Sequence, residues 1–214
     1  MTSSESRLVL DEQAKMSRLV VNENLTLDGV MQSPSDPDED RRGGFEHGGW
    51  APPFFDQVMG DTAAEGIAKG GALLFGRRTY EQFASFWSTQ PDDNPFAAVL
   101  NERQKYVAST TLEEPLAWKN SSLLEGDAVE AVATLKERPG KDLVVLGSGE
   151  LVQSLMRRNL VDEYVLLIHP LVLGSGRRLF VDGGPPAALR LVDTKTTTTG
   201  VVIATYHPAE PMVG

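Results

Sequence analysis

Short apolar runs alternate along the chain with stretches of helical period. The runs at residues 19–24, 72–75, 105–109 and 142–146 have the length and composition of buried strands. Helices are predicted between them and after them, over about 54–69, 76–87, 127–139 and 150–160. In the second of these, the apolar residues Tyr80, Phe83, Ala84 and Trp87 stand at i, i+3, i+4 and i+7 and define one face. This alternation of strand and helix predicts an α/β domain with a largely parallel sheet.

The pattern changes after residue 162. Strands are predicted over 163–168, 189–193 and 201–206, and a threonine-rich turn at Gly200 joins the last two. The C-terminal part therefore predicts an antiparallel hairpin on a mixed, mostly parallel sheet flanked by helices. Since no linker and no internal repeat interrupts the chain, we expect one domain over 16–208, a poorly ordered arm over 1–15 and a tail over 209–214.

A polar stretch rich in glycine and proline separates the first strand from the first helix. It runs from residue 25 to 53, and loops of this length in compact domains are usually functional or disordered, so we expect a lid. The charged segment 36–42 is interpreted as a solvated loop within it. The helix that follows should carry Phe54, Phe55, Val58 and Met59 toward the core and end at Gly70-Gly71.

Composition and charge narrow the classes of protein. The 214 residues are 41% hydrophobic and 23% charged, which is typical of a globular protein. A formal charge of -10 disfavours nucleic acid and anionic membranes as partners. Without cysteine, and with histidines only at 47, 169 and 207, no metal site is predicted. No apolar run approaches a membrane span and no signal peptide is evident, so a cytoplasmic protein is expected.

Two glycine turns each stand between a predicted strand and a helix. They are Gly76-Arg77-Arg78-Thr79 and Gly147-Ser148-Gly149. Helix N-termini attract phosphate, and the arginines add fork-shaped donors. Each turn alone is equally well an ordinary connection, but the two together favour a nucleotide. Neither turn completes the dinucleotide fingerprint of a Rossmann dehydrogenase.

Two further groups of residues could carry chemistry. Asp56 lies in the first turn of the first helix, close in sequence to Trp50 and Phe55, where it could bind a flat heterocycle and help deliver a proton. The alternative is a solvated acid that favours the helix dipole. The segment 174–178 could be a basic rim for a substrate phosphate or a glycine-rich bulge.

An ordered set of segments resembles the dihydrofolate reductase family. The segments are Asn24–Gly29, Gly76–Glu81, Lys105–Ser109, Val145–Leu151, Leu160–Glu163 and Pro170–Gly176. They are most similar to the branch that contains the reductase domain of the bifunctional riboflavin-biosynthesis deaminase/reductase. The resemblance covers about residues 16–208 and implies a three-layer fold, an NADPH cofactor, a small-molecule substrate and a homodimer.

The resemblance also implies roles for particular residues. Those expected to contact the cofactor are Thr26, Gly29, Gly76, Arg77, Arg78, Thr79, Ser109, Thr110, Gly147, Ser148, Gly149, Glu150 and Leu151. Asp56 and Asp28 are the expected catalytic residues, and Trp50 and Phe55 the expected substrate contacts.

Two positions depart from the riboflavin reductases. Asn22 stands where those enzymes usually have a lysine, and Leu146 interrupts their Val-Glu-Gly-Gly turn, so two polar groups of the substrate site are missing. The leading hypothesis is an NADPH-dependent reductase that passes a hydride to a C=N or C=O carbon. The alternative is a non-catalytic nucleotide-binding module.

Overall fold

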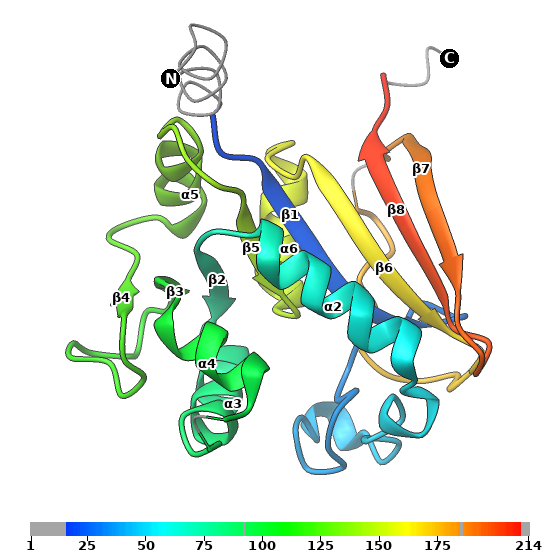
Figure 1. Cartoon of the computed structure of the whole chain (residues 1–214). Helices are drawn as coiled ribbons and strands as arrows, with labels where there is room; N and C mark the ends of the chain where they lie inside the picture. Colours follow the sequence, from blue (N-terminus) through cyan, green and yellow to red (C-terminus); the bar gives the residue numbers. More distant parts are fainter. Residues whose placement is uncertain (1–15, 92, 185, 211–214) are drawn as a thin grey trace, which may run out of the picture.

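The computed structural model describes residues 16–91, 93–184 and 186–210, and the arm expected over 1–15 lies outside them (Figure 1). The strands are β1 (Leu19–Thr26), β2 (Leu73–Gly76), β3 (Lys105–Ala108), β4 (Ser121–Leu123), β5 (Leu143–Leu146), β6 (Glu163–His169), β7 (Leu189–Thr196) and β8 (Val202–Pro208). The helices are α2 (Gln57–Lys69), α3 (Arg77–Trp87), α4 (Pro95–Glu102), α5 (Ala128–Lys136) and α6 (Gly149–Arg157), with short 3₁₀ turns at Arg42–Gly44 and Pro52–Phe54.

The eight strands form one sheet in the order β4-β3-β2-β5-β1-β6-β8-β7. The strands from β4 to β6 are parallel, while β8 pairs antiparallel with both β6 and β7. This confirms the predicted α/β fold with a mixed, mostly parallel sheet and an antiparallel C-terminal hairpin. The sequence interpretation passed over β4, which is only three residues long, and α4, which Asn94 caps through its side chain.

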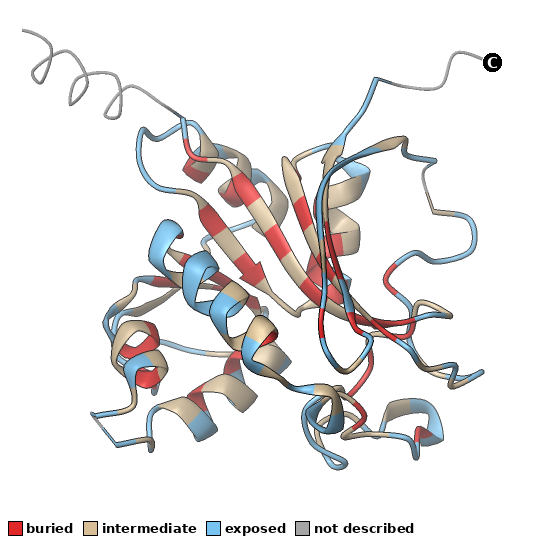
Figure 2. Ribbon diagram, turned by 45° about the vertical axis from the view of Figure 1, so that its right-hand side comes forward, coloured by how far each residue is buried: buried red, intermediate tan, exposed pale blue. Residues whose placement is uncertain are grey.

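Side-chain alternation along the central strands builds a core on each face of the sheet (Figure 2). On one face, Leu19, Val21 and Leu74 pack with residues of α5 and α6. On the other face, Leu73 and Phe75 pack with residues of α3 and α4. Alternate residues of β2 thus face opposite layers, as the pleat of a strand requires.

Helix α2 lies across the second face but is packed loosely against it (Figure 1). Met59 is its one buried residue, and it contributes to a small cluster with Val201 and Ile203. The expectation that Phe55 points into the core is wrong, since its side chain is 64% exposed. The reason is local: Phe55 has extended backbone before the cap of α2 and projects to the rim of the sheet.

The long connection after β1 contains no α-helix or strand beyond the end of β1, in agreement with the sequence interpretation. Side chains fix its path. Val30, Phe45 and Trp50 form a cluster of their own, and the indole Nε1 of Trp50 donates to the carbonyl of Gln32 at 2.8 Å. The Gln32 amide in turn donates to the carbonyls of Asp40 and Arg42. The connection is therefore a folded layer over one end of the sheet.

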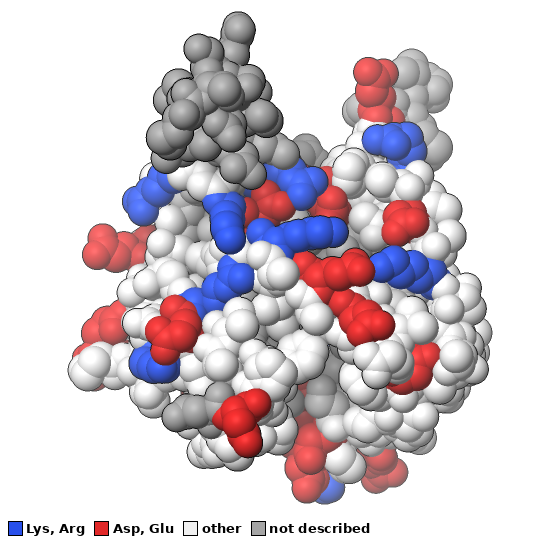
Figure 3. All heavy atoms as spheres, in the orientation of Figure 1, with Lys and Arg blue, Asp and Glu red and all other residues white. Residues whose placement is uncertain are grey.

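On the face that carries α2, basic and acidic side chains are interspersed (Figure 3). The net charge of -10 therefore does not produce a uniform acidic surface there. Within the described residues, no helix combines the length and the apolar character that a bilayer span requires.

His169 links the long connection to the sheet and makes folding sensitive to acid. Its buried ring lies edge-on to Trp50 and Phe54, and its Nε2 is 3.0 Å from the Asn24 side-chain oxygen. Burial lowers the pKa of His169 to about 4. Between its ordinary pKa of about 6.5 and this value, the unfolded chain binds a proton that the folded chain does not.

The contribution of His169 to the free energy of unfolding should therefore be complete above about pH 6.5. It should fall by an amount on the order of 3 kcal/mol as the pH drops toward 4. Chemical denaturation at a series of pH values measures the loss. His169→Gln, which cannot be protonated, should show a flatter profile over the same range. An equally steep profile in that variant would show that other groups control acid unfolding.

Candidate functional site

A cavity of about 640 Å³ opens at the carboxyl ends of the parallel strands. The structure brings eleven of the thirteen expected cofactor residues to its wall: Gly76, Arg77, Arg78, Thr79, Ser109, Thr110, Gly147, Ser148, Gly149, Glu150 and Leu151. They come from the ends of three strands and the starts of two helices. The long connection supplies the opposite wall with Met31, Gln32, Glu39 and Arg42. We call this space the strand-end cavity.

The two glycine turns lie side by side at the base of this cavity. The Gly76 N–H donates to the Ser148 hydroxyl at 3.0 Å, and a side chain at Gly147 would touch Thr79. Ser148 reaches this position because its backbone is left-handed, with φ 64°, which is uncommon for a residue other than glycine. The two turns therefore face one space, as expected, and a hydrogen bond joins them directly.

Arginine side chains gather around Glu150, in the first turn of α6. The guanidinium groups of Arg42 and Arg177 lie 2.8 Å and 2.5 Å from its carboxylate, and that of Arg78 lies 3.9 Å away. Asp40 also pairs with Arg42, at 2.5 Å. Three cations face two anions around Glu150, while the rest of the cavity wall adds Arg77, Glu39 and Asp127, so the positive potential that a phosphorylated ligand needs is confined to the surroundings of Glu150.

Part of the charged segment 36–42 differs from the expected solvated loop. Asp36 and Asp38 are exposed, but Glu39, Asp40 and Arg42 are half-buried in the wall of the strand-end cavity. Arg177 and Arg178, in the segment after β6, also have different surroundings. Arg177 lines the cavity, while Arg178 donates to the Asp28 carbonyl at 2.7 Å.

Asp28 joins two loops. Its carboxylate accepts from the Thr26 hydroxyl at 2.6 Å and from the backbone N–H groups of Leu173 and Gly174. The hydrogen bond from Thr26 is the main reason that the pKa of Asp28 is lowered to about 2. Thr26, Asp28 and Gly29 lie beside the strand-end cavity without lining it. The catalytic role of Asp28 stays a prediction, and an ionised, fully engaged carboxylate has no proton to give at neutral pH.

Asp56 has the geometry of a helix cap. One carboxylate oxygen accepts from the Met59 N–H at 3.0 Å, and the other accepts from the N–H and the hydroxyl of Thr198, both at 2.7 Å. The hydrogen bond from Met59 is the main cause of a lowered pKa for this exposed group. Neither Asp56 nor Trp50 lines a cavity described here. Asp56 is therefore the N-cap of α2 and does not lie in its first turn, a position that suits the helix-dipole alternative, and its role in proton delivery stays a prediction.

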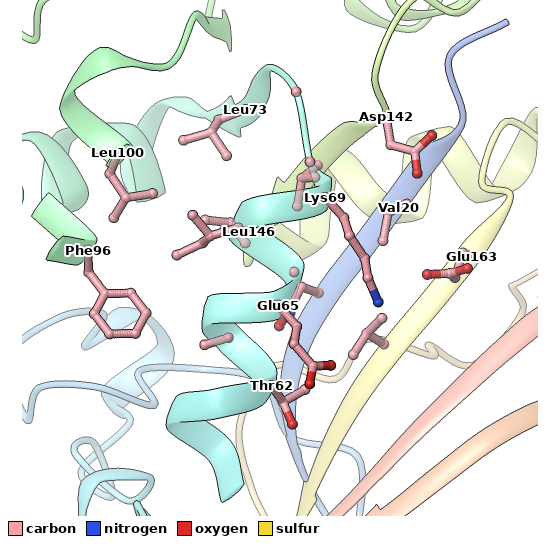
Figure 4. Close-up of a pocket in the computed structure, with 18 of the residues that line it drawn as sticks. Val20, Thr62, Glu65, Lys69, Leu73, Phe96, Leu100, Asp142, Leu146 and Glu163 are labelled. Carbon is pink, nitrogen blue, oxygen red and sulfur yellow. The ribbon is translucent and has the colours of Figure 1, made fainter. Parts of the chain in front are cut away.

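A second cavity of about 490 Å³ lies between α2 and the sheet (Figure 4). Apolar side chains form most of its wall: Val20, Leu73, Phe83, Trp87, Phe96, Leu100, Val144, Leu146, Val165 and Ile203. Phe55 lies at its rim, and charged groups such as Asp142 and Glu163 stand at one end. Asn22 and Leu146, the two positions that depart from the riboflavin reductases, both line it. We call it the α2 cavity.

The two cavities lie on either side of β1 and share the lining residue Phe83. Asn22 lines the α2 cavity and the next residue, Glu23, lines the strand-end cavity, while Phe83 lines both. The Gly147 N–H donates to the Asn22 carbonyl at 3.1 Å and joins the two strands here. The chain leaves β1 toward β2 on one side and leaves β5 toward β6 on the other, so this is the switch point at which open α/β sheets bind ligands.

Sequence reasoning missed Glu23, although the pattern holds a signal for it. Glu23 occupies an odd position of β1, where Leu19, Val21 and Leu25 are buried and apolar, and it is itself only 3% exposed. A charged residue type in a run of buried positions is rare unless it is paired. Arg42 was also missed as part of the cavity wall, because only the fold brings it to Glu150, whereas Arg177 belongs to the segment that the sequence offered as a basic rim.

Comparison with known proteins places the chain in a family. Residues 17–203 match the RibD C-terminal domain, and the protein belongs to this family, whose members are reductases; this confirms the resemblance seen in the sequence and supports an oxidoreductase. The protein is 30% identical over 197 residues to the uncharacterized protein YyaP of Bacillus subtilis (strain 168), an alignment that covers 90% of this chain and 96% of YyaP.

Solved structures share the fold. A protein of Shewanella sp. PV-4 assigned to riboflavin biosynthesis aligns with a TM-score of 0.68 at 22% identity, over 90% of this chain and 99% of its own. A pyrimidine reductase-like protein of Corynebacterium diphtheriae aligns with a TM-score of 0.59 at 11% identity, over 91% and 93% of the two chains.

Two substitutions of Ser148 test the junction between the turns. Ser148→Ala keeps the left-handed backbone strain and removes the acceptor of the Gly76 N–H, whereas Ser148→Gly removes the acceptor and relieves the strain. We expect both variants to be less stable than the wild type, with the glycine variant more stable than the alanine variant by about 1 kcal/mol. Denaturant titration measures the order. An alanine variant as stable as the glycine variant would contradict the strained geometry.

Proposed function

We propose that this protein is an NADPH-dependent reductase that holds the cofactor in the strand-end cavity and the substrate in the α2 cavity. The observation that supports it best is the convergence of eleven expected cofactor residues on one space of about 640 Å³, a size typical of ligand sites. When bound, NADPH would supply a hydride for a C=N or C=O carbon.

The residues of this cavity fit a phosphorylated dinucleotide. Arg77, Arg78 and Thr79 would bind the phosphates from the start of α3, and Gly147 to Leu151 would bind them from the turn before α6. Arg42 and Arg177 add guanidinium groups that Glu150 already orders. Ser109 and Thr110 would contact the far end of the cofactor, at the carboxyl end of β3.

The α2 cavity supports a substrate with a flat, weakly polar ring. Its wall is mostly apolar, and it has Asn22 and Leu146 where the riboflavin reductases have a lysine and a glutamate. Polar substrate atoms facing Leu146 would lose their hydrogen bonds on binding. A pterin-like heterocycle or an aromatic carbonyl compound therefore suits the site better than a pyrimidine ribotide. Since Asp56 lies outside both cavities, we assign the proton that completes the reduction to water.

Family membership links the protein to the reductase step of riboflavin biosynthesis, and the two departures favour a related reduction on another ring. They also support the second candidate, a nucleotide-binding module without turnover, since both polar groups of the substrate site are absent. The homodimer and the cytoplasmic location remain predictions.

Arg77 and Arg78, in the glycine turn after β2, should make the protein prefer NADPH to NADH. Arg77→Ala with Arg78→Ala removes two charged donors. A hydrogen bond from one such donor to a phosphate is worth about 1.5–3 kcal/mol, so NADPH should bind at least about 100-fold more weakly when both are lost. NADH should lose much less if these groups contact the extra phosphate. Calorimetry measures both dissociation constants, with Arg158→Ala, which lies outside the cavity and pairs with Glu130, as the control. An equal loss of affinity for NADPH and NADH would show that these arginines do not contact the extra phosphate.

Turnover distinguishes the two candidates. NADPH oxidation should be seen with a member of a panel of pterins, pyrimidine ribotides and carbonyl compounds; binding of NADPH without oxidation of any of them would favour the module. Ala63→Trp, which fills the α2 cavity from α2, should raise KM for the active compound at least about tenfold without changing the NADPH dissociation constant. Ala64→Trp, at the neighbouring exposed position outside the cavity wall, is the matched control. Equal effects of the two substitutions would place the substrate elsewhere.

A further inference from the structure

Glu23 is a buried carboxyl group that the proposed reductase mechanism does not use. It lies in β1 with 3% of its surface exposed. Its Oε2 has no hydrogen-bond partner among the residues that the structure describes. A buried polar atom without a partner is costly, and in native proteins it calls for an explanation such as a catalytic role or an absent ligand.

The position of Glu23 supplies that explanation. Its side chain lines the strand-end cavity beside Asn24 and Met31, where β1 continues past the end of β5. The turn at Gly147 leaves the sheet at the same place, since the Gly147 N–H donates a hydrogen bond to the carbonyl of Asn22, the residue before Glu23. Glu23 therefore belongs to the cavity wall, but its Oε2 is sealed from water, so a ligand would contact this oxygen after the side chain turns toward the cavity.

The charged groups around the cavity leave Glu23 without a cation. The long connection contributes Glu39, Asp40 and Arg42, α3 contributes Arg77 and Arg78, and Asp127, Glu150 and Arg177 complete the wall. The arginines pair with Glu81, Asp40 and Glu150 instead. Burial first, and then the charge of Glu39, raise the pKa of Glu23 to about 8, so the group is protonated at neutral pH.

A protonated carboxyl group has an O–H donor and a C=O acceptor side by side. An amide presents the complementary pair, an N–H donor next to a C=O acceptor, so the two groups can form a pair of parallel hydrogen bonds. An ammonium or amidinium ligand would require the ionised form, which this apolar position disfavours.

We propose that Glu23 is a binding residue that pairs, as a neutral acid, with the amide edge of the ring that enters the strand-end cavity. This inference rests on the proposed function, because the nicotinamide of NADPH carries a carboxamide. The lactam edge of a pterin has the same chemistry, and a pterin that bound in the strand-end cavity instead of the α2 cavity would be the other source of the amide.

Ligand binding tests the pairing. The probes are NADPH and its 3-acetylpyridine analogue, in which a methyl group replaces the amide nitrogen. Wild-type protein should prefer NADPH by up to about tenfold, the value of one hydrogen bond, and Glu23→Ala should lose this preference. Glu23→Gln keeps a donor and an acceptor, so it should keep the preference.

The pH dependence of binding separates the neutral acid from other roles. Calorimetry should show wild-type affinity for NADPH falling by up to about tenfold in total above about pH 8, as the donor is lost, while Glu23→Gln stays level. An equal pH profile in the two proteins, or unchanged affinity for both probes in Glu23→Ala, would overturn the proposal.

A pterin is the second arm of the same experiment. If the pterin and not NADPH shows the dependence on Glu23, the pairing stands and the amide belongs to the substrate. If NADPH fails to bind while the pterin binds through Glu23, the cofactor assignment fails and the inference survives. If neither compound binds to the wild type, both the pairing and the reductase proposal are wrong.

The free protein gives a readout that needs no ligand. Between pH 4.5 and about 8 the unfolded chain has lost the Glu23 proton and the folded chain keeps it, so this residue destabilises the fold increasingly as the pH rises. Glu23→Gln should therefore gain in Tm relative to the wild type from pH 5 to pH 8. A Tm below that of the wild type at pH 8 would mean that the folded protein holds an ionised, paired carboxylate, and the proposal would fall.

Discussion

The hydrogen bond from the Gly76 N–H to the Ser148 hydroxyl is the constraint on which the candidate site depends. The register of β2 on β5 brings the two strand ends together, and Ser148 takes a left-handed backbone conformation to reach across. Two helix starts are thereby held at one end of the sheet. Without this junction, the glycine turns would be two separate connections, each of a kind common in α/β proteins.

Electrostatics follow from the same arrangement. An acidic protein can attract an anion only where cations outnumber acids locally, and Glu150 organises such a place. Arg42 reaches it from the long connection, 108 positions away, and Arg177 from the segment after β6. Because salt bridges already order these side chains, a phosphate that replaces Glu150 as their partner would lose less conformational entropy in fixing them. The folded long connection is thus part of the binding wall as well as a cover.

Local signals predicted most elements of this fold. Hydrophobic period revealed seven of the eight strands, within a residue or two at most ends, and Asp127, the first residue of the helix predicted over 127–139, caps α5. Contacts between distant segments could not be predicted. Asp56 was a candidate for chemistry because of its aromatic neighbours and the family resemblance. Its actual partner Thr198 lies 142 positions away, so the local sequence could not predict that hydrogen bond. The burial of Glu23 could have been predicted, since the alternation of apolar residues in β1 marks its position as buried.

The pleat of β1 explains how one strand can serve two sites. Asn22 and Glu23 are neighbours in the chain, yet they line different cavities because successive side chains point to opposite faces. A shift of the register by one residue would exchange them and place an acid against the apolar wall under α2. The parallel pairing of Asn22 with Leu146 fixes this register. Substitutions at 22 and 146 can therefore alter the α2 cavity while Glu23 and the glycine turns keep the strand-end cavity unchanged, so that the two walls can vary independently.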